Sequence, residues 1–176
     1  DQEMSRGLGD VYKRQESVGD DLFRRSIYAF WRRSVAPTAF FDASKRRTCQ
    51  VRTIRTNTPL HALTLLNDKS VLASSYHLAK LTLNRSSDDA DRIQWLFRQV
   101  LSRTPTDREM AVVNGELQGL RTYYQNEAME AENLLVPLEP LTLGGAPRPD
   151  LPASELAAWS LTASTLLNLD EAQTRE

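Results

Sequence analysis

The sequence predicts an all-α fold, an irregular helical domain preceded by an extended basic N-terminal arm. Two observations favour helices: apolar residues recur at intervals of three and four, and hydroxyl or proline residues stand where helices should begin. Strand-like alternation is weak by comparison. The 176 residues suffice for one domain with a sizeable core, and a content of 40% hydrophobic and 26% charged residues is typical of a globular protein.

The segment 24–33 is ambiguous between a helix and a strand. Ile27 and Trp31 fit helical spacing, whereas Tyr28 and Phe30 alternate as strand residues do. The helix is the favoured interpretation.

The first clearly predicted helix begins at Pro59 and ends near Asn67. Thr58 supplies a capping hydroxyl, and a proline fits the first helical position because its missing N–H is not needed there. The expected buried face consists of Leu60, Leu63 and Leu66.

A second helix is predicted over residues 70–84, and residues 86–89 are expected to cap a third. In the third helix, apolar residues follow the i, i+3, i+4, i+7 spacing of a single buried face. That face consists of Ile93, Leu96, Phe97, Val100 and Leu101.

Pro105 and Thr106 open a fourth helix, and Glu109 stands three residues after the threonine. This spacing predicts a capping box, in which each side chain satisfies a free backbone N–H of the other residue. The helix is expected to break near Asn126 and to resume over residues 127–135. Its apolar face consists of Met110, Val113, Leu117, Leu120 and Tyr124.

The last predicted helix follows a proline-rich loop. Residues 136–153 contain five of the eight prolines and two glycines, a composition typical of loops. Ser154 is expected to cap the helix. Its buried face consists of Leu156, Trp159, Ala163, Leu166 and Leu167.

Charge is unevenly distributed along the chain. Residues 22–56 contain nine Lys or Arg and one acid, whereas the formal net charge of the whole chain is −1. Residues 36–57 are predicted to form an extended or irregular arm. This basic region could pair with the acidic helices, form a solvated face, or bind an anionic partner.

The basic arm contains the candidate site. Arginine has a planar guanidinium that binds carboxylates through two hydrogen bonds, and an asparagine can cap a turn. The favoured role is a structural lock of the arm onto the helices, and the alternative is binding of an anionic ligand such as an acidic or sulfated glycan. Nucleic acid is not expected, since the chain lacks a broad basic surface. The candidate residues are Arg46, Arg47, Arg52, Arg55 and Asn57.

Motifs for cofactor, metal or nucleophilic chemistry are not found. The single cysteine, Cys49, allows no internal disulfide and no Cys-x-x-Cys-His haem motif. His61 and His77 have no partner at metal-ligand spacing and are expected on different helices. Asp170 and Glu171 could form a catalytic pair, but the favoured interpretation is helix-end solvation or a salt bridge to the basic arm. No apolar run is long enough to span a membrane.

Several short segments stand in a characteristic order along the chain. In about residues 22–176 they resemble the Psd-one domain, a domain of unknown function at the C-terminal end of planctomycete cytochrome-c-type surface proteins. The segments are RRSIYAFWRR at 24–33, FDA at 41–43, CQVR at 49–52, RTNTPL at 55–60, FRQVLSRTPTDRE at 97–109, and the closing segment around Trp159 and residues 168–171.

The resemblance implies a context that the residues themselves do not show. It implies an extracytoplasmic protein, periplasmic or at the cell surface, with haem c in upstream domains and no cofactor in this fragment. The segment GLGDVYKRQ at 7–15 resembles translated sequencing-adapter DNA, so residues 1–15 are interpreted as an artefact. Residues 16–176 are then a single helical domain, the C-terminal fragment of a larger protein.

The expected function is a non-catalytic structural or interaction domain whose partners are the upstream domains of the same polypeptide. One alternative is a component of a polysaccharide-acting enzyme that is completed by those upstream domains. Another alternative is an independent module that binds anionic polysaccharide.

Overall fold

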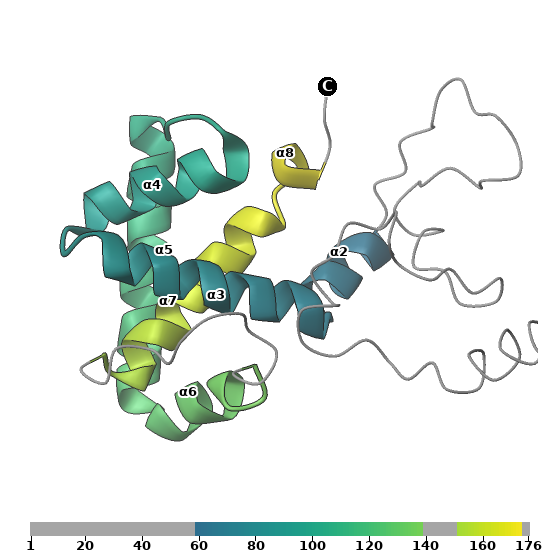
Figure 1. The fold of residues 1–176 in the computed structure, drawn as a ribbon, viewed down its shortest axis with the longest axis vertical. Helices are drawn as coiled ribbons and strands as arrows, with labels where there is room; N and C mark the ends of the chain where they lie inside the picture. The colour runs from purple at the N-terminus through teal and green to yellow at the C-terminus, as the bar shows by residue number, and fades with distance from the viewer. Residues whose placement is uncertain (1–58, 139–150, 174–176) are drawn as a thin grey trace, which may run out of the picture.

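A computed structural model describes residues 59–138 and 151–173, and this part of the chain is built from α-helices without a strand (Figure 1). The predicted all-α class is confirmed for these residues. The predicted basic arm and the ambiguous segment 24–33 lie outside them. Within the same ranges, no helix combines the length and the apolar character needed to cross a membrane.

Helix α2 (Pro59–Asn67) has the predicted bounds, but two of its three predicted buried residues, Leu63 and Leu66, are exposed. Leu63 and Leu66 are 57% and 51% exposed, whereas Leu65 is buried. A short helix buries only the side that meets its neighbour, and three-residue spacing alone does not identify that side. Here the neighbour is α3 (Lys69–Arg85).

Helix α3 is capped by Asp68, whose carboxylate accepts hydrogen bonds from the backbone N–H groups of Ser70 at 2.8 Å and Val71 at 3.3 Å. Helix α4 (Asp89–Leu101) is capped in the same way by Asp88. It ends at Ser102, whose φ of 59° is left-handed and turns the chain out of the helix. The predicted apolar face of α4 is confirmed, with Ile93, Leu96 and Phe97 buried.

Helix α5 (Asp107–Asn126) begins with the predicted capping box of Thr106 and Glu109. The predicted break near Asn126 is also confirmed, because α6 (Ala128–Leu135) follows as a separate helix. Val113, Leu117 and Tyr124 form the buried face of α5, as expected from their spacing.

Helix α7 (Ala153–Leu167) begins two residues earlier than expected, because Pro152 and not Ser154 is its N-cap. The carbonyl of Pro152 accepts hydrogen bonds from the backbone N–H groups of Glu155 at 3.0 Å and Leu156 at 3.2 Å. Because proline has no N–H to leave unsatisfied, it is well suited to this helix start. Ser154 therefore lies within the first turn, and α8 (Asp170–Gln173) follows the end of α7.

Helix α7 lies at the centre of the described domain, in contact with α3, α4, α5 and α6 (Figure 1). Its largest core residue is the fully buried Trp159, which lies among small residues and the buried Leu156 and Leu166. The buried hydroxyls of Ser160 and Thr162 donate to the carbonyls four residues before them, at 2.7 and 3.0 Å, which satisfies their polarity. The small residues that let neighbouring helices approach α7 are Ala157, Ala158, Ser160, Ala163 and Ser164.

Candidate functional site

Arg121 of α5 joins the first turns of two other helices. Its Nη2 donates to Asp89 Oδ1 of α4 at 3.0 Å, and its Nε donates to Glu155 Oε2 of α7 at 2.9 Å. The hydrogen bonds from Arg121 lower the pKa of Asp89, and burial opposes this effect. Both carboxylates also lie at helix N-termini, where the helix dipole favours negative charge.

Arg92 extends this cluster towards the core. Its Nη1 donates to Asp89 Oδ1 at 3.2 Å, and its Nε donates to the carbonyl of Ser86 at 2.7 Å. Its guanidinium carbon lies 5.7 Å from the ring centroid of Trp159. The Nε1 of Trp159 in turn donates to Glu155 Oε1 at 2.9 Å. The polar edge of the largest core residue is therefore satisfied by the same ion cluster.

Arg103, between α4 and α5, forms a second ion cluster. It binds Glu109 through two hydrogen bonds of 2.9 and 2.6 Å, and Glu171 of α8 through two of 2.8 Å. Hydrogen bonds from Arg103, followed by those from Thr106, lower the pKa of Glu109 to about 2. Arg103 also lowers the pKa of Glu171.

Three carboxylates of these clusters, those of Asp89, Glu109 and Glu171, are arranged to stay ionised. A general acid needs a raised pKa, which burial or a neighbouring carboxylate produces. Asp89, Glu109 and Glu171 instead have lowered pKa values because each faces an arginine. The two ion clusters therefore connect helices and are poorly suited to proton transfer.

An open pocket of about 450 Å³ lies on the surface where α3 ends and α4 begins. Its volume is within the range of small-molecule sites. The guanidinium of Arg85 lies 5.9 Å from the ring centroid of Trp95, close enough for a cation–π interaction. The pocket carries two guanidinium groups and one carboxylate. It is lined by Arg85, Ser86, Asp91, Gln94, Trp95 and Arg98.

The predicted candidate site lies outside the described residues, so Arg46, Arg47, Arg52, Arg55 and Asn57 remain predictions. His61 and His77 lie on different helices, α2 and α3, as expected. Over residues 59–138 and 151–173, no group of three or more His, Cys, Asp or Glu is placed to hold a metal ion. Glu171 pairs with Arg103.

A family model described as "Protein of unknown function (DUF1553)", with the short name PSD1, matches residues 3–117. The match covers more than half of the 176 residues. The chain belongs to the PSD1 family. This agrees with the resemblance to the Psd-one domain, which also carries no known reaction. No curated protein and no solved structure matches the chain significantly.

The segment 97–109, which contributed to the resemblance, forms one structural unit in this PSD1 domain. Phe97 is buried, and the guanidinium of Arg103 lies 5.6 Å from its ring centroid. Arg103 then binds Glu109, which completes the capping box with Thr106. Phe97, Arg103, Thr106 and Glu109 of this segment are thus explained by their role in the α4–α5 junction.

The surface pocket of the PSD1 domain was missed by the sequence analysis, although a local signal exists. Asp91, Gln94, Trp95 and Arg98 stand at i, i+3, i+4 and i+7, so they share one face of α4. Trp95 on this otherwise polar face is the local signal that indicates a binding surface. The bonds of Arg121 could not be found in this way, because its partners are 32 and 34 residues away.

Proposed function

We propose that this PSD1 domain is a non-catalytic structural or interaction domain, the C-terminal part of a larger secreted or periplasmic cytochrome-c-type protein. The observation that supports the non-catalytic role is the pairing of its converging carboxylates with arginines. Glu109 and Glu171 meet at Arg103, and Asp89 and Glu155 meet at Arg121. Such pairs stabilise an arrangement of helices.

Acid-pair catalysis is the alternative against which this observation counts. Glycoside hydrolysis uses two carboxyl groups, one of which must remain protonated near neutral pH to act as the acid. With a pKa of about 2, Glu109 is ionised at every pH at which such enzymes commonly work. Its partner Glu171 has a lowered pKa as well.

The larger context of this proposal is supported by family membership and by the resemblance to the Psd-one domain. In that context the upstream domains carry haem c, and this domain packs against them or connects them to other molecules. The protein would then be extracytoplasmic.

The parent locus provides the test. Long-read sequencing across the codon for Glu16 should show a reading frame that continues upstream into a signal peptide and a Cys-x-x-Cys-His motif. The upstream region, produced separately, should bind this chain in isothermal titration calorimetry. A frame that truly starts near Asp1 would contradict the proposed context. An upstream region that carries the motif but does not bind, and gains no stability when joined to this domain, would contradict the interaction role.

A further inference from the structure

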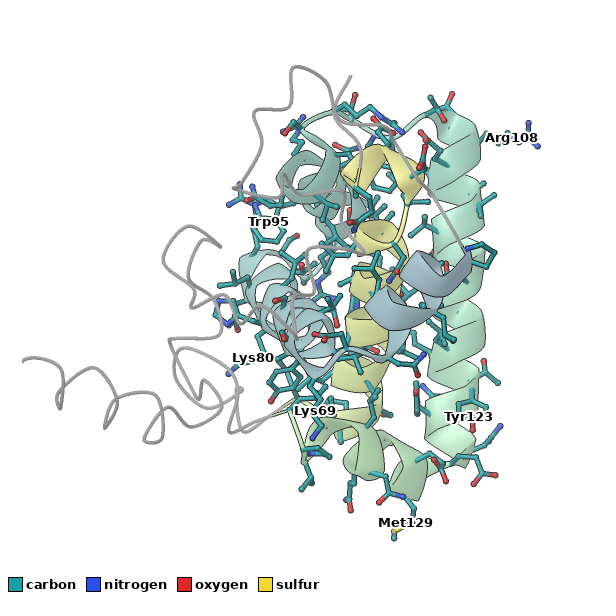
Figure 2. The ribbon with its side chains drawn as sticks, turned by 90° about the vertical axis from the view of Figure 1, so that its right-hand side faces the viewer. Lys69, Lys80, Trp95, Arg108, Tyr123 and Met129 are labelled. Carbon is teal, nitrogen blue, oxygen red and sulfur yellow. The ribbon has the colours of Figure 1, made fainter. Side chains whose placement is uncertain are left out.

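We propose that the pocket between α3 and α4 binds a sugar residue that carries one anionic group, either a carboxylate or a sulfate. This inference rests on the proposed interaction role, because it identifies the chemical class of one partner. The pocket is open and its lining is mainly polar, which suits a unit of a longer saccharide chain that passes over the surface. Trp95 lies at the edge of the described helices in Figure 2.

The two arginines of the pocket differ from those of the ion clusters. Arg92, Arg103 and Arg121 all donate hydrogen bonds to carboxylates. Among the residues that the structure describes, neither Arg85 nor Arg98 has a hydrogen-bond acceptor or an acidic partner for its guanidinium. Their N–H groups are therefore available to an anion, and an arginine can bind a carboxylate or a sulfate through two parallel hydrogen bonds.

Trp95 prepares Arg85 for such a contact. A guanidinium that stacks on an indole ring keeps the N–H groups at its edge free, because the cation–π interaction uses the face of both groups. The stacking also restricts the long arginine side chain before the ligand arrives. Less conformational entropy is then lost on binding, which is the general advantage of a preorganised site.

The remaining polar residues favour a ligand with hydroxyl groups. The carboxylate of Asp91 only accepts hydrogen bonds, whereas the amide of Gln94 both donates and accepts them. The Oγ of Ser86 accepts from the backbone N–H of Asp88 at 3.1 Å, which leaves its own proton free to donate. The hydroxyl groups of a sugar provide donors and acceptors for all three side chains.

The charge balance of the pocket indicates how many anionic groups the ligand has. Two guanidiniums and one carboxylate leave a net charge of +1, which a single carboxylate or sulfate neutralises. A phosphate dianion would leave one negative charge without a cationic partner, and that charge would lie close to the carboxylate of Asp91. Phosphate also lacks the several hydroxyl groups with which a sugar could donate hydrogen bonds to Asp91. A monoanionic sugar therefore matches the lining better than a free phosphate.

The test is a titration of the full chain with tetrasaccharides of equal length at low ionic strength. The probes are tetragalacturonate, a galactose tetrasaccharide with one sulfate per residue, neutral galactotetraose and inorganic phosphate. Saturable binding of at least one charged tetrasaccharide is expected, with the neutral one at least about tenfold weaker, since a charge-assisted contact contributes that much or more. Binding should weaken as salt screens the contact.

Matched variants locate the binding site. We expect Arg98→Ala and Arg85→Ala to weaken binding of the charged tetrasaccharide by about tenfold or more. Arg108→Ala should leave it unchanged, because Arg108 is another exposed helical arginine but lies on the opposite side of the described helices from Trp95 (Figure 2). Circular dichroism should show that all three variants fold.

Four results would overturn the inference. They are no binding at low salt, equal binding of the neutral tetrasaccharide, phosphate binding as tight as that of the charged sugars, and equal losses in the Arg98 and Arg108 variants. The last result would indicate general charge attraction. Because none of these measurements involves the upstream region, failure here is distinguishable from failure of the proposed interaction role.

Discussion

Arg103 and Glu171 are 68 positions apart in the sequence and are joined by two hydrogen bonds of 2.8 Å. This contact fastens α8 to the junction between α4 and α5. Since α8 has only four residues, from Asp170 to Gln173, it has little stability of its own. Its position therefore depends on tertiary contacts, and the pair between Glu171 and Arg103 is one of them.

We expect Glu171→Gln to lower the melting temperature slightly, by on the order of one or two degrees, because the pair is partly exposed and such pairs contribute little. Differential scanning calorimetry would measure the change. Glu132→Gln is the matched control, since Glu132 is an exposed helical glutamate that has no side-chain partner among residues 59–138 and 151–173. Equal effects of the two substitutions would show that the contact with Arg103 contributes nothing.

The pH dependence of the free energy of unfolding should reveal the lowered pKa of Glu109. Its pKa is lowered to about 2 in the folded protein from an ordinary value of 4.5. A lowered pKa contributes stability that is fully present above the unfolded value and is lost as the pH falls towards the folded value. The free energy of unfolding, measured with urea between pH 5 and pH 2, should therefore decrease more steeply in the wild type than in Glu109→Gln. Parallel curves would contradict this role.

Replacement of Arg121, which joins α4, α5 and α7, should destabilise the fold. We expect Arg121→Leu to lower the free energy of unfolding by about 2–4 kcal/mol, because Asp89 and Glu155 would lose their shared cation in a half-buried site. Arg121→Lys should be intermediate, since an ammonium cannot bind both carboxylates with the same geometry. Arg108→Leu is the exposed control. Urea unfolding would measure all three, and a loss no greater than that of the control would rule out the proposed bridge.

Substitution of a small buried residue of α7 by a larger one should lower the stability of the fold. We expect Ala157→Leu to lower the free energy of unfolding by about 1–3 kcal/mol, because Ala157 is fully buried and extra carbon atoms would displace neighbouring helices. Ala111→Leu places the same side chain on an exposed position of α5 and should change stability by less than about 0.5 kcal/mol. Chemical denaturation of both variants tests the comparison, and a tolerated Ala157→Leu would show that α7 is loosely packed.

The parts of the fold that depend on local chemistry could be predicted from the sequence. The capping box of Thr106 and Glu109 fixed the start of α5, and the apolar spacing from Ile93 onwards fixed the buried face of α4. The face of α2 could not be fixed in this way, because the side that is buried depends on where α3 packs, and Leu65, which lies outside the predicted three-residue spacing, is buried. Ser154 failed as a cap since the preceding proline offers an earlier start.

Long-range pairs limit what a sequence can show about the candidate sites. Nothing near Arg121 indicates that its partners are Asp89 and Glu155, because the pairing depends on how three helices pack. The pocket on the polar face of α4 depends mostly on local spacing instead. That spacing can be recognised in the sequence, and only the position of Arg85, which comes from the preceding helix, required the structure.

The central position of α7 has a consequence for biosynthesis. The ribosome releases α3 to α6 before α7, so these helices emerge without the element that all of them contact. The parts of their apolar faces that pack against α7 stay exposed to water, or bound to a chaperone, until about residue 167 has left the exit tunnel. A translation product that stops in the proline-rich region before residue 151 would keep these faces uncovered and would be a ready substrate for proteolysis or aggregation.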